Sequence, residues 1–259
     1  MMFWRRGRYA KYKRGQSWWR RFLSLGSWIT WGTRLVILLV VLDAFYVSTI
    51  WPDWKKIAVG PVPKSSFIRR YEATYRSNDW PKISWHPVTL DDMPKHLQRA
   101  VVVAEDSRFW QHDGFDLIAF KEAMDHNLSE GRFAFGASTI SQQTVKNLFL
   151  NPSRNPLRKW HELLLTWGME MNLKKRRILE LYLNIAEFDR GVYGVEAAAQ
   201  HYWGIPASQL DSGQAVELAA CLPSPTRNNP QTRTEVFERR VEKINGWLAP
   251  SPEQSSGEI

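Results

Sequence analysis

Residues 35–51 form an apolar run, LVILLVVLDAFYVSTIW, that contains a single charged residue, Asp43. Extended back to residue 28, the stretch reaches the length of roughly 20 residues that a helix needs to cross a bilayer. Trp28, Trp31 and Trp51 stand near its ends, as is typical of a membrane interface. The run therefore predicts a transmembrane anchor over residues 28–51. A cleaved signal peptide is the alternative, but the run is long and no A-x-A-like site follows it.

The positive charge of the chain is concentrated before this anchor. The whole sequence has a formal charge of +9, yet residues 1–34 contain nine basic residues and no acid, so the remainder is neutral. Because positive residues stay on the cytoplasmic side of an anchor, residues 1–27 predict a basic cytoplasmic tail and an exported remainder. The neutral remainder argues against nucleic-acid binding, which needs a basic domain face.

The chain after the anchor divides by composition into three parts. Residues 52–88 are rich in Pro and aromatic residues and predict an extended connector. Residues 89–248 contain the helical patterning and are long enough for one domain with its own core. Residues 249–259 predict a flexible tail. The lone cysteine, Cys221, excludes an internal disulfide and a CxxC metal or redox site.

An acidic residue continues an apolar helix stripe near residue 105. Leu97, Val101 and Ala104 follow helical spacing, and Glu105 lies on the same face one turn after Val101. Asp106 points to a different side of the helix. A carboxyl on an apolar face is desolvated, which raises its pKa and lets it exchange a proton near neutral pH. The alternative is an ordinary helix end with solvated acids.

A second helix is predicted directly after the segment FGAST, with Ser138 or Thr139 as its cap. Its polar face consists of Gln142, Gln143, Lys146 and Asn147. Amide and ammonium groups beside a helix N-terminus suit an anionic sugar phosphate. A solvated helix face is the alternative interpretation.

A third segment, residues 155–184, continues this basic character. Arg158 precedes Glu162 by one helical turn, so an ordinary ion pair explains both residues. Over residues 132–177, however, nine basic residues are accompanied only by Glu162 and Glu170. The local excess of positive charge indicates an anion-binding site, attraction to anionic lipid headgroups, or both.

Five blocks of sequence, in order, resemble one known enzyme family. They are EDSRFWQHDGFD, GASTISQQTVKNLFL, RKWHE, KRRILELYLN and GVYGVEAAAQHYWG. These blocks resemble those of glycosyltransferase family 51, the peptidoglycan glycosyltransferases, over about residues 65–248. Class A penicillin-binding proteins share them and add a transpeptidase domain, but the sequence contains no S-x-x-K or K-T-G. The chain is therefore similar to the monofunctional members of the family.

The resemblance implies a mostly α, lysozyme-like domain of two lobes behind one N-terminal transmembrane helix. It implies that the substrate is lipid II, which is polymerised into β-1,4 glycan strands with inversion and release of undecaprenyl pyrophosphate. Glu105 matches the family's general base, whose pKa should lie near ambient pH. Glu162 matches the second catalytic carboxylate, which is expected to assist the leaving pyrophosphate through a divalent cation, Mg²⁺ or Mn²⁺.

The resemblance also assigns binding and structural residues. Lys146, Arg154 and Arg158 match groups that stabilise charge on the leaving phosphate. Further substrate contacts are expected from Gln142, Gln143, Asn147, Ser138 and Lys175. The scaffold of the first block is expected to consist of Asp106, Phe109, His112, Gly114 and Asp116. The implied partners are lipid II, the growing glycan chain, the membrane and other cell-wall or division proteins, with the catalytic domain on the periplasmic side of a bacterial inner membrane.

Two other functions fit parts of the sequence. A lysozyme-like lytic muramidase also uses paired carboxylates, but a hydrolase of neutral glycosidic bonds has no pyrophosphate for the basic residues to bind. A non-catalytic, membrane-anchored cell-wall scaffold is expected to have lost its catalytic acids, and both Glu105 and Glu162 are present. The sequence therefore favours the glycosyltransferase.

Overall fold

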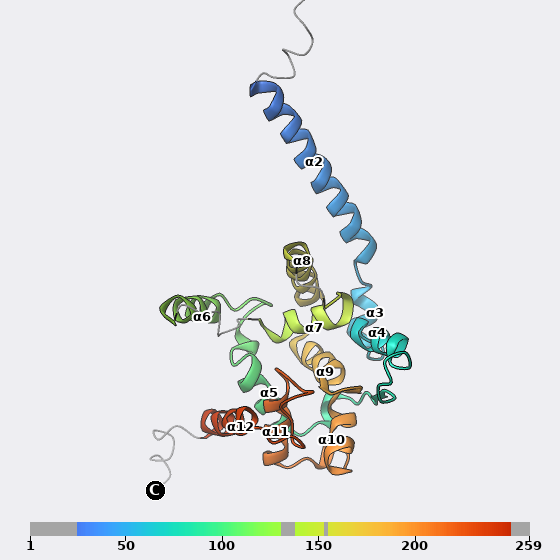
Figure 1. Ribbon diagram of the computed structural model, residues 1–259, viewed down its shortest axis with the longest axis vertical. Helices are drawn as coiled ribbons and strands as arrows, with labels where there is room; N and C mark the ends of the chain where they lie inside the picture. The colour runs from blue at the N-terminus through green and yellow to red at the C-terminus, as the bar shows by residue number, and fades with distance from the viewer. Residues whose placement is uncertain (1–24, 131–137, 153–154, 250–259) are drawn as a thin grey trace, which may run out of the picture. The chain divides into compact units, whose positions relative to one another are not determined.

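The computed structural model describes residues 25–130, 138–152 and 155–249 (Figure 1). The chain forms two compact units, Met1–Trp51 and Pro52–Ile259. In the first unit, α2 (Leu25–Ile50) is the helix that is long and apolar enough to cross a membrane, among the described residues. Its large apolar side chains are exposed, from Trp28 and Ile29 through Phe45. Such a surface suits lipid better than water.

The second unit is mostly helical, as the sequence predicts, and its core includes α5 (Lys95–Glu105), which packs along α11 (Ser212–Cys221). Leu97 and Val101 on the predicted stripe of α5 are fully buried. Small residues such as Ala219 on α11 allow the two helix backbones to approach closely. α12 (Glu235–Leu248) packs against both helices.

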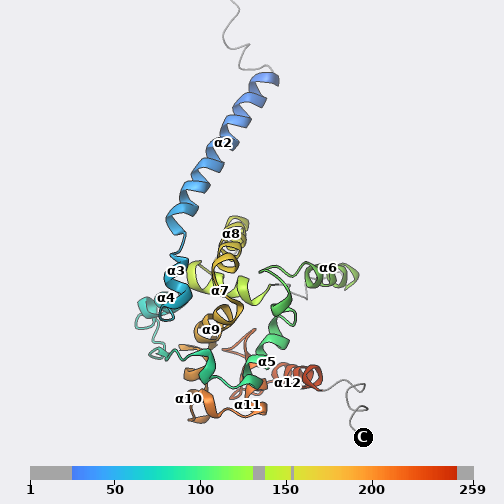
Figure 2. The same ribbon diagram turned by 180° about the vertical axis from the view of Figure 1, so that it is seen from behind.

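A second group of helices surrounds α7 (Ile140–Phe149). In both views α7 lies beside α8 (Pro156–Asn172) and α9 (Lys175–Ile185) (Figure 1 and Figure 2). Thr139, rather than Ser138, caps α7, because its hydroxyl accepts from the Gln142 backbone N–H in a capping box. Asn155 caps α8, and Pro156 occupies the tolerated first position of that helix.

The prediction that residues 52–88 form an extended connector is wrong. The segment forms α3 (Trp54–Val59), α4 (Ser66–Thr74) and the short strand β1 (Ser84–Trp85). Asp53 and Ser65 cap the two helices with their side chains. Both helices are short, so their apolar residues give little periodicity; the two caps are the local signal for them.

A small sheet of three strands lies next to α4, with strand order β1-β3-β2. β3 (Val192–Tyr193) pairs in parallel with β1 and antiparallel with β2 (Glu187–Asp189). Ile68 and Tyr71 of α4 form a buried cluster with Tyr193. The remaining described elements are the helices α6 (Leu117–Glu130) and α10 (Val195–Trp203) and the 3-10 turns Leu90–Asp92, Phe109–Gln111 and Ala207–Gln209.

Candidate active site

Glu105 is the last residue of α5, and its carboxyl is turned into the protein. The Asp106 backbone leaves the helical conformation (φ −163°, ψ 72°), so the helix ends at Glu105. Only 11% of the Glu105 side chain is exposed. Burial raises the pKa of Glu105 above its ordinary value, although a hydrogen bond from Gln143 and the charges of Arg240 and Lys146 lower it. The predicted direction of this pKa shift is confirmed.

Both oxygens of the Glu105 carboxylate accept hydrogen bonds. Arg240 Nη2 donates to Oε1 at 2.7 Å, and Gln143 Nε2 donates to Oε2 at 3.0 Å. The Tyr182 hydroxyl donates to Gln143 Oε1 at 3.2 Å. This last bond orients the amide, because it places the Gln143 oxygen at Tyr182 and leaves the NH₂ group to face Glu105.

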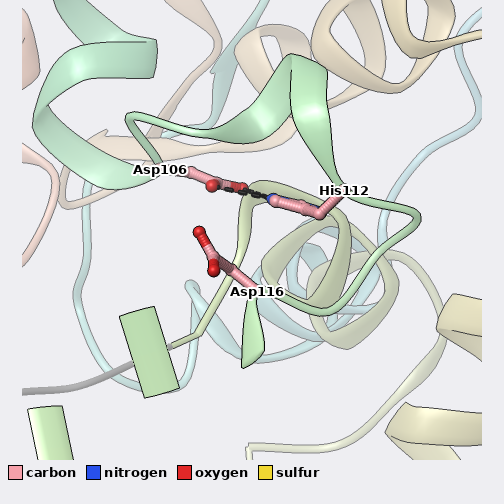
Figure 3. Close-up of side chains that lie close together, drawn as sticks. All are labelled: Asp106, His112 and Asp116. Carbon is pink, nitrogen blue, oxygen red and sulfur yellow. Dashed lines mark hydrogen bonds and ion pairs between the residues drawn. The ribbon is translucent and has the colours of Figure 1, made fainter. Parts of the chain in front are cut away.

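Three side chains that lie close together in Figure 3, Asp106, His112 and Asp116, fix the loop after Glu105. His112 Nε2 lies 2.9 Å and 3.1 Å from the two Asp106 oxygens, and Asp106 also accepts from the Ile140 backbone N–H at 2.9 Å. The Gly114 N–H donates to His112 Nδ1 at 3.1 Å, so the Nε2 atom carries the proton. Asp106 thereby connects the end of α5 to the start of α7.

Asp116 completes the fixation of the loop. Its Oδ1 accepts from the backbone N–H groups of Ile118 and Ala119, at 3.0 Å and 2.9 Å, at the start of α6. Its Oδ2 forms an ion pair with Arg108 Nε at 3.3 Å. The carboxylate is therefore used to begin a helix and to hold the loop, and these are structural contacts.

Gly114, Phe109 and Lys175 fix the same loop against α8 and α9. Gly114 has φ +92°, and a Cβ there would lie 2.9 Å from both Glu170 Cγ and Thr166 Cγ2. Phe109 is fully buried, and Lys175 Nζ lies 4.6 Å from the centre of its ring. Lys175 also pairs with Glu170 at 2.7 Å. These two contacts engage Lys175 within the protein, and the substrate contact that the resemblance implies for it stays a prediction.

Lys146, Arg158, Lys159 and Glu162 form a cluster across α7 and α8, called here the cationic cluster. Glu162 is 3% exposed and accepts from Arg158 Nη1 at 2.6 Å and from Lys159 Nζ at 2.5 Å. Burial lowers the pKa of Lys146, and the positive charges of Arg158 and Lys159 lower it further, while Glu162 and Glu105 raise it. The cluster therefore contains three cations and one acid and is suited to bind an anion.

The residues around Glu162 do not fit a divalent cation in this arrangement. Arg158 and Lys159 each occupy one oxygen of the Glu162 carboxylate. A metal ion placed there would be repelled by these two cations at close range.

A second possible group of metal ligands lies in the loop after α5. The ligand atoms of Asp106, His112 and Asp116 lie within 4.8 Å of one another. Both His112 nitrogens are already in hydrogen bonds, so this group is a loop scaffold rather than a metal site.

The other residues singled out in the sequence have mixed positions. Gln142 is largely buried, its Oε1 accepts from the Thr139 N–H in the capping box, and the residue also lines the cavity between α6, α7 and α8. Ser138 is exposed next to Glu105, and Asn147 lines a cavity with Lys146. Arg154 lies outside the residues that the structure describes.

Three of the cavities lined by the described residues lie beside these groups. The largest, about 590 Å³, lies between α6, α7 and α8 and has Ser138 and Lys159 among its lining residues. Its apolar walls are formed by Phe115, Leu117, Phe120, Leu163, Leu164 and Trp167. A cavity of about 160 Å³ at Glu105 shares Ser138 with it, and another of about 160 Å³ is lined by Gln143, Lys146 and Glu187.

Sequence reasoning missed Arg240, although a signal for it exists. Phe237, Arg240 and Ile244 follow helical spacing on α12, and Phe237 and Ile244 are fully buried. Arg240 is thus a cation on the apolar face of a helix, just as Glu105 is an acid on the apolar face of α5. No local pattern connects two residues that are 135 positions apart. Only the packing of α12 against α5 brings them together.

The fold and the site define a mostly helical enzyme with a buried carboxyl, suited to proton exchange, beside a cluster of three cations and one acid. Residues 75–247 match the transglycosylase family. The chain belongs to the transglycosylase family, which has a lysozyme-like fold.

Individual relatives cover most of the chain. It is 37% identical to the biosynthetic peptidoglycan transglycosylase of Laribacter hongkongensis, over 83% of this chain and 96% of that protein. It is 38% identical to the protein of the same name from Burkholderia thailandensis, over 91% of each chain. It is 44% identical to that from Shewanella frigidimarina, over 70% of this chain and 76% of that protein.

Proposed function

We propose that this protein is a peptidoglycan glycosyltransferase that polymerises lipid II into β-1,4 glycan strands and releases undecaprenyl pyrophosphate. Membership of the transglycosylase family supports this proposal, as do relatives named biosynthetic peptidoglycan transglycosylase. The observation that carries it is the arrangement of Glu105, a desolvated carboxyl that is held by two donors next to the cationic cluster.

In this proposal Glu105 is the general base. It takes the proton from the 4-hydroxyl of the acceptor GlcNAc, and that oxygen attacks the anomeric carbon of the donor chain. The new carbon–oxygen bond forms as the bond to the pyrophosphate breaks, so the anomeric configuration inverts and the electron pair leaves with the pyrophosphate. A carboxyl with a pKa raised by burial suits this proton transfer near neutral pH.

The cationic cluster stabilises the leaving pyrophosphate. Lys146, Arg158 and Lys159 supply positive charge in a partly desolvated place, where charge-assisted hydrogen bonds to phosphate oxygens are strong. Glu162 holds Arg158 and Lys159 in position. Arg154 is proposed as a further phosphate contact on the basis of the family resemblance. No step is assigned to a divalent cation, because the surroundings of Glu162 do not fit one.

Gln143 positions the base, and Asn147 and Ser138 line the cavities on either side of it. The apolar cavity between α6 and α8 offers space for part of the isoprenoid chain, since Lys159 stands at its wall and also belongs to the cationic cluster. A cleft that receives both a sugar phosphate and an apolar chain suits lipid II.

The proposed location is a bacterial inner membrane, with α2 as a single-pass anchor. The basic residues 1–27 support a cytoplasmic N-terminus and hence a periplasmic catalytic unit. Partners other than lipid II, the growing glycan chain and the membrane are proposed among cell-wall and division proteins.

The test uses the full-length chain in detergent with labelled lipid II, followed by separation of the products by size. Glycan polymer should accumulate, and the same protein should not release fragments from finished, lipid-free glycan. Cleavage of finished glycan without growth from lipid II would overturn the proposal and support a muramidase.

A further inference from the structure

Arg240 reaches the Glu105 carboxylate from the C-terminal helix, far outside the sequence blocks that contain the catalytic carboxylates. Its Nη2 atom lies 2.7 Å from Glu105 Oε1 and 3.3 Å from the backbone carbonyl oxygen of Ala104. The arginine therefore binds the side chain of the base and, at the same time, the last turn of the helix that carries it. A cation is favourable at a helix C-terminus, so the second contact adds to the first.

The other oxygen of Glu105 faces a different kind of donor. Gln143 is neutral, and its Nε2 atom lies 3.0 Å from Oε2. Burial raises the pKa of Tyr182 well above its ordinary value, so the tyrosine keeps its proton and continues to donate to Gln143. Arg240, Glu105, Gln143 and Tyr182 thus form one chain of hydrogen bonds that joins α12, α5, α7 and α9.

The two contacts affect the two oxygens unequally. Both hydrogen bonds are charge-assisted because the acceptor is a carboxylate, but only the guanidinium also places a full positive charge beside its oxygen. Oε1 is therefore the oxygen that is fixed and neutralised, whereas Oε2 keeps more of its basicity. Oε2 is the oxygen next to Gln143, which also lines the cavity that contains Lys146.

We infer that Arg240 is a positioning residue for the general base: it orients the Glu105 carboxylate, keeps it in the charged form and leaves Oε2 to accept the proton. This inference rests on the proposed function. Without the arginine, burial would raise the pKa of Glu105 further, so a smaller fraction of the carboxyl would be in the charged form that acts as a base.

The charged and titratable groups around Glu105 support this assignment. Burial opposes the charged form of Glu105, whereas the hydrogen bond from Gln143 and the charges of Arg240 on α12 and Lys146 on α7 favour it. Tyr182 on α9 stays neutral, and Asp106 is bound to His112 and to the Ile140 N–H. Arg240 is the cation in direct contact with the carboxylate, so of the two cations it is the one whose loss should change the ionisation of Glu105 more.

The experiment measures kcat/KM for lipid II polymerisation in detergent as a function of pH. In Arg240→Met the acid limb of the profile should move to higher pH by about one unit, so the rate near neutral pH should fall up to about tenfold and recover at higher pH. Arg240→Lys keeps the charge, so its pH profile should lie between those of the wild type and of Arg240→Met. Arg239 is the matched control, because it is the adjacent arginine on α12 and pairs with Glu235 on the surface. Arg239→Met should keep the wild-type profile.

A merely structural role for Arg240 gives a different result. The rate of Arg240→Met would then fall equally at every pH, the acid limb would stay in place, and the inference would be overturned. If Arg240→Met does not fold, the same decision rests on Arg240→Lys, whose acid limb should still move upward, because one ammonium does not reproduce the guanidinium contacts. A wild-type protein that makes no polymer would instead refute the proposed function.

Discussion

Replacement of Lys146 by Met should slow lipid II polymerisation about tenfold to a hundredfold. Lys146 is partly buried, and its charge interacts with Glu162, Arg158 and Lys159 in the cationic cluster. A charge-assisted hydrogen bond to a phosphate oxygen contributes about 1.5–3 kcal/mol, and about 1.4 kcal/mol corresponds to a factor of ten in rate. Because Met keeps most of the bulk of the side chain, the loss reports on the charge rather than on packing.

The assay has to separate this effect from the ionisation of the base. The charge of Lys146 lowers the pKa of Glu105, so its removal should also move the acid limb of the pH profile slightly upward. Initial rates are therefore compared on the plateau above that limb, in detergent. Lys174→Met is the matched control, since Lys174 is exposed and belongs to the same basic stretch of sequence.

Two results would refute the assignment of Lys146 to the leaving group. One is a Lys146→Met rate on the plateau close to that of wild type. The other is an equal loss in Lys174→Met, which would mean that general positive charge, rather than the cationic cluster, is responsible. A loss seen only on liposomes, with full activity in detergent, would assign Lys146 to membrane binding.

Three further outcomes follow from the structure. Chelation by EDTA should lower polymerisation only a few-fold, because side-chain cations already surround Glu162; complete loss that Mg²⁺ restores would favour the cation implied by the resemblance. Gly114→Ala should lower the free energy of unfolding by about 1–3 kcal/mol in denaturant titrations, because of its positive φ and close contacts, whereas Gly246→Ala on α12, with open space around its Cβ, should be neutral or stabilising. Because the folded-state pKa of Glu105 is raised, its stabilising contribution is present below the ordinary Glu pKa and is lost as pH rises through the raised value. The melting temperature of Glu105→Gln relative to wild type should therefore rise over that window, and a pH-independent difference would contradict burial of the carboxyl.

The sequence was most informative where local patterns carry the physical cause. The helical spacing of Leu97, Val101 and Glu105 predicted that Glu105 lies on a buried helix face. Desolvation on that face then determined the direction of its pKa shift. The start of α7 was predicted to within one residue, since Ser and Thr are both good caps and Thr139 is the one used. The apolar run before residue 52 likewise predicted α2.

Features that depend on tertiary packing were not predictable in the same way. The sequence pattern assigns Gln142 to a polar helix face, but in the structure the residue is buried and belongs to a capping box. Lys175 belongs to a basic stretch, yet it packs on Phe109 and pairs with Glu170. Arg240 acts on Glu105 only through the packing of α12 against α5. In each case the side chain contacts a neighbour in the folded structure that the spacing of residues along the sequence does not reveal.

The most direct test of the central claim is the rate of Glu105→Gln on labelled lipid II in detergent. Glutamine keeps the size of the side chain and removes the charge and the proton-accepting oxygen. Polymerisation should fall by at least about a hundredfold, the lower part of the range for loss of a general base, while the far-ultraviolet circular dichroism of the folded unit is unchanged. A variant that folds and retains half of the wild-type rate would contradict the assignment of Glu105 as the general base.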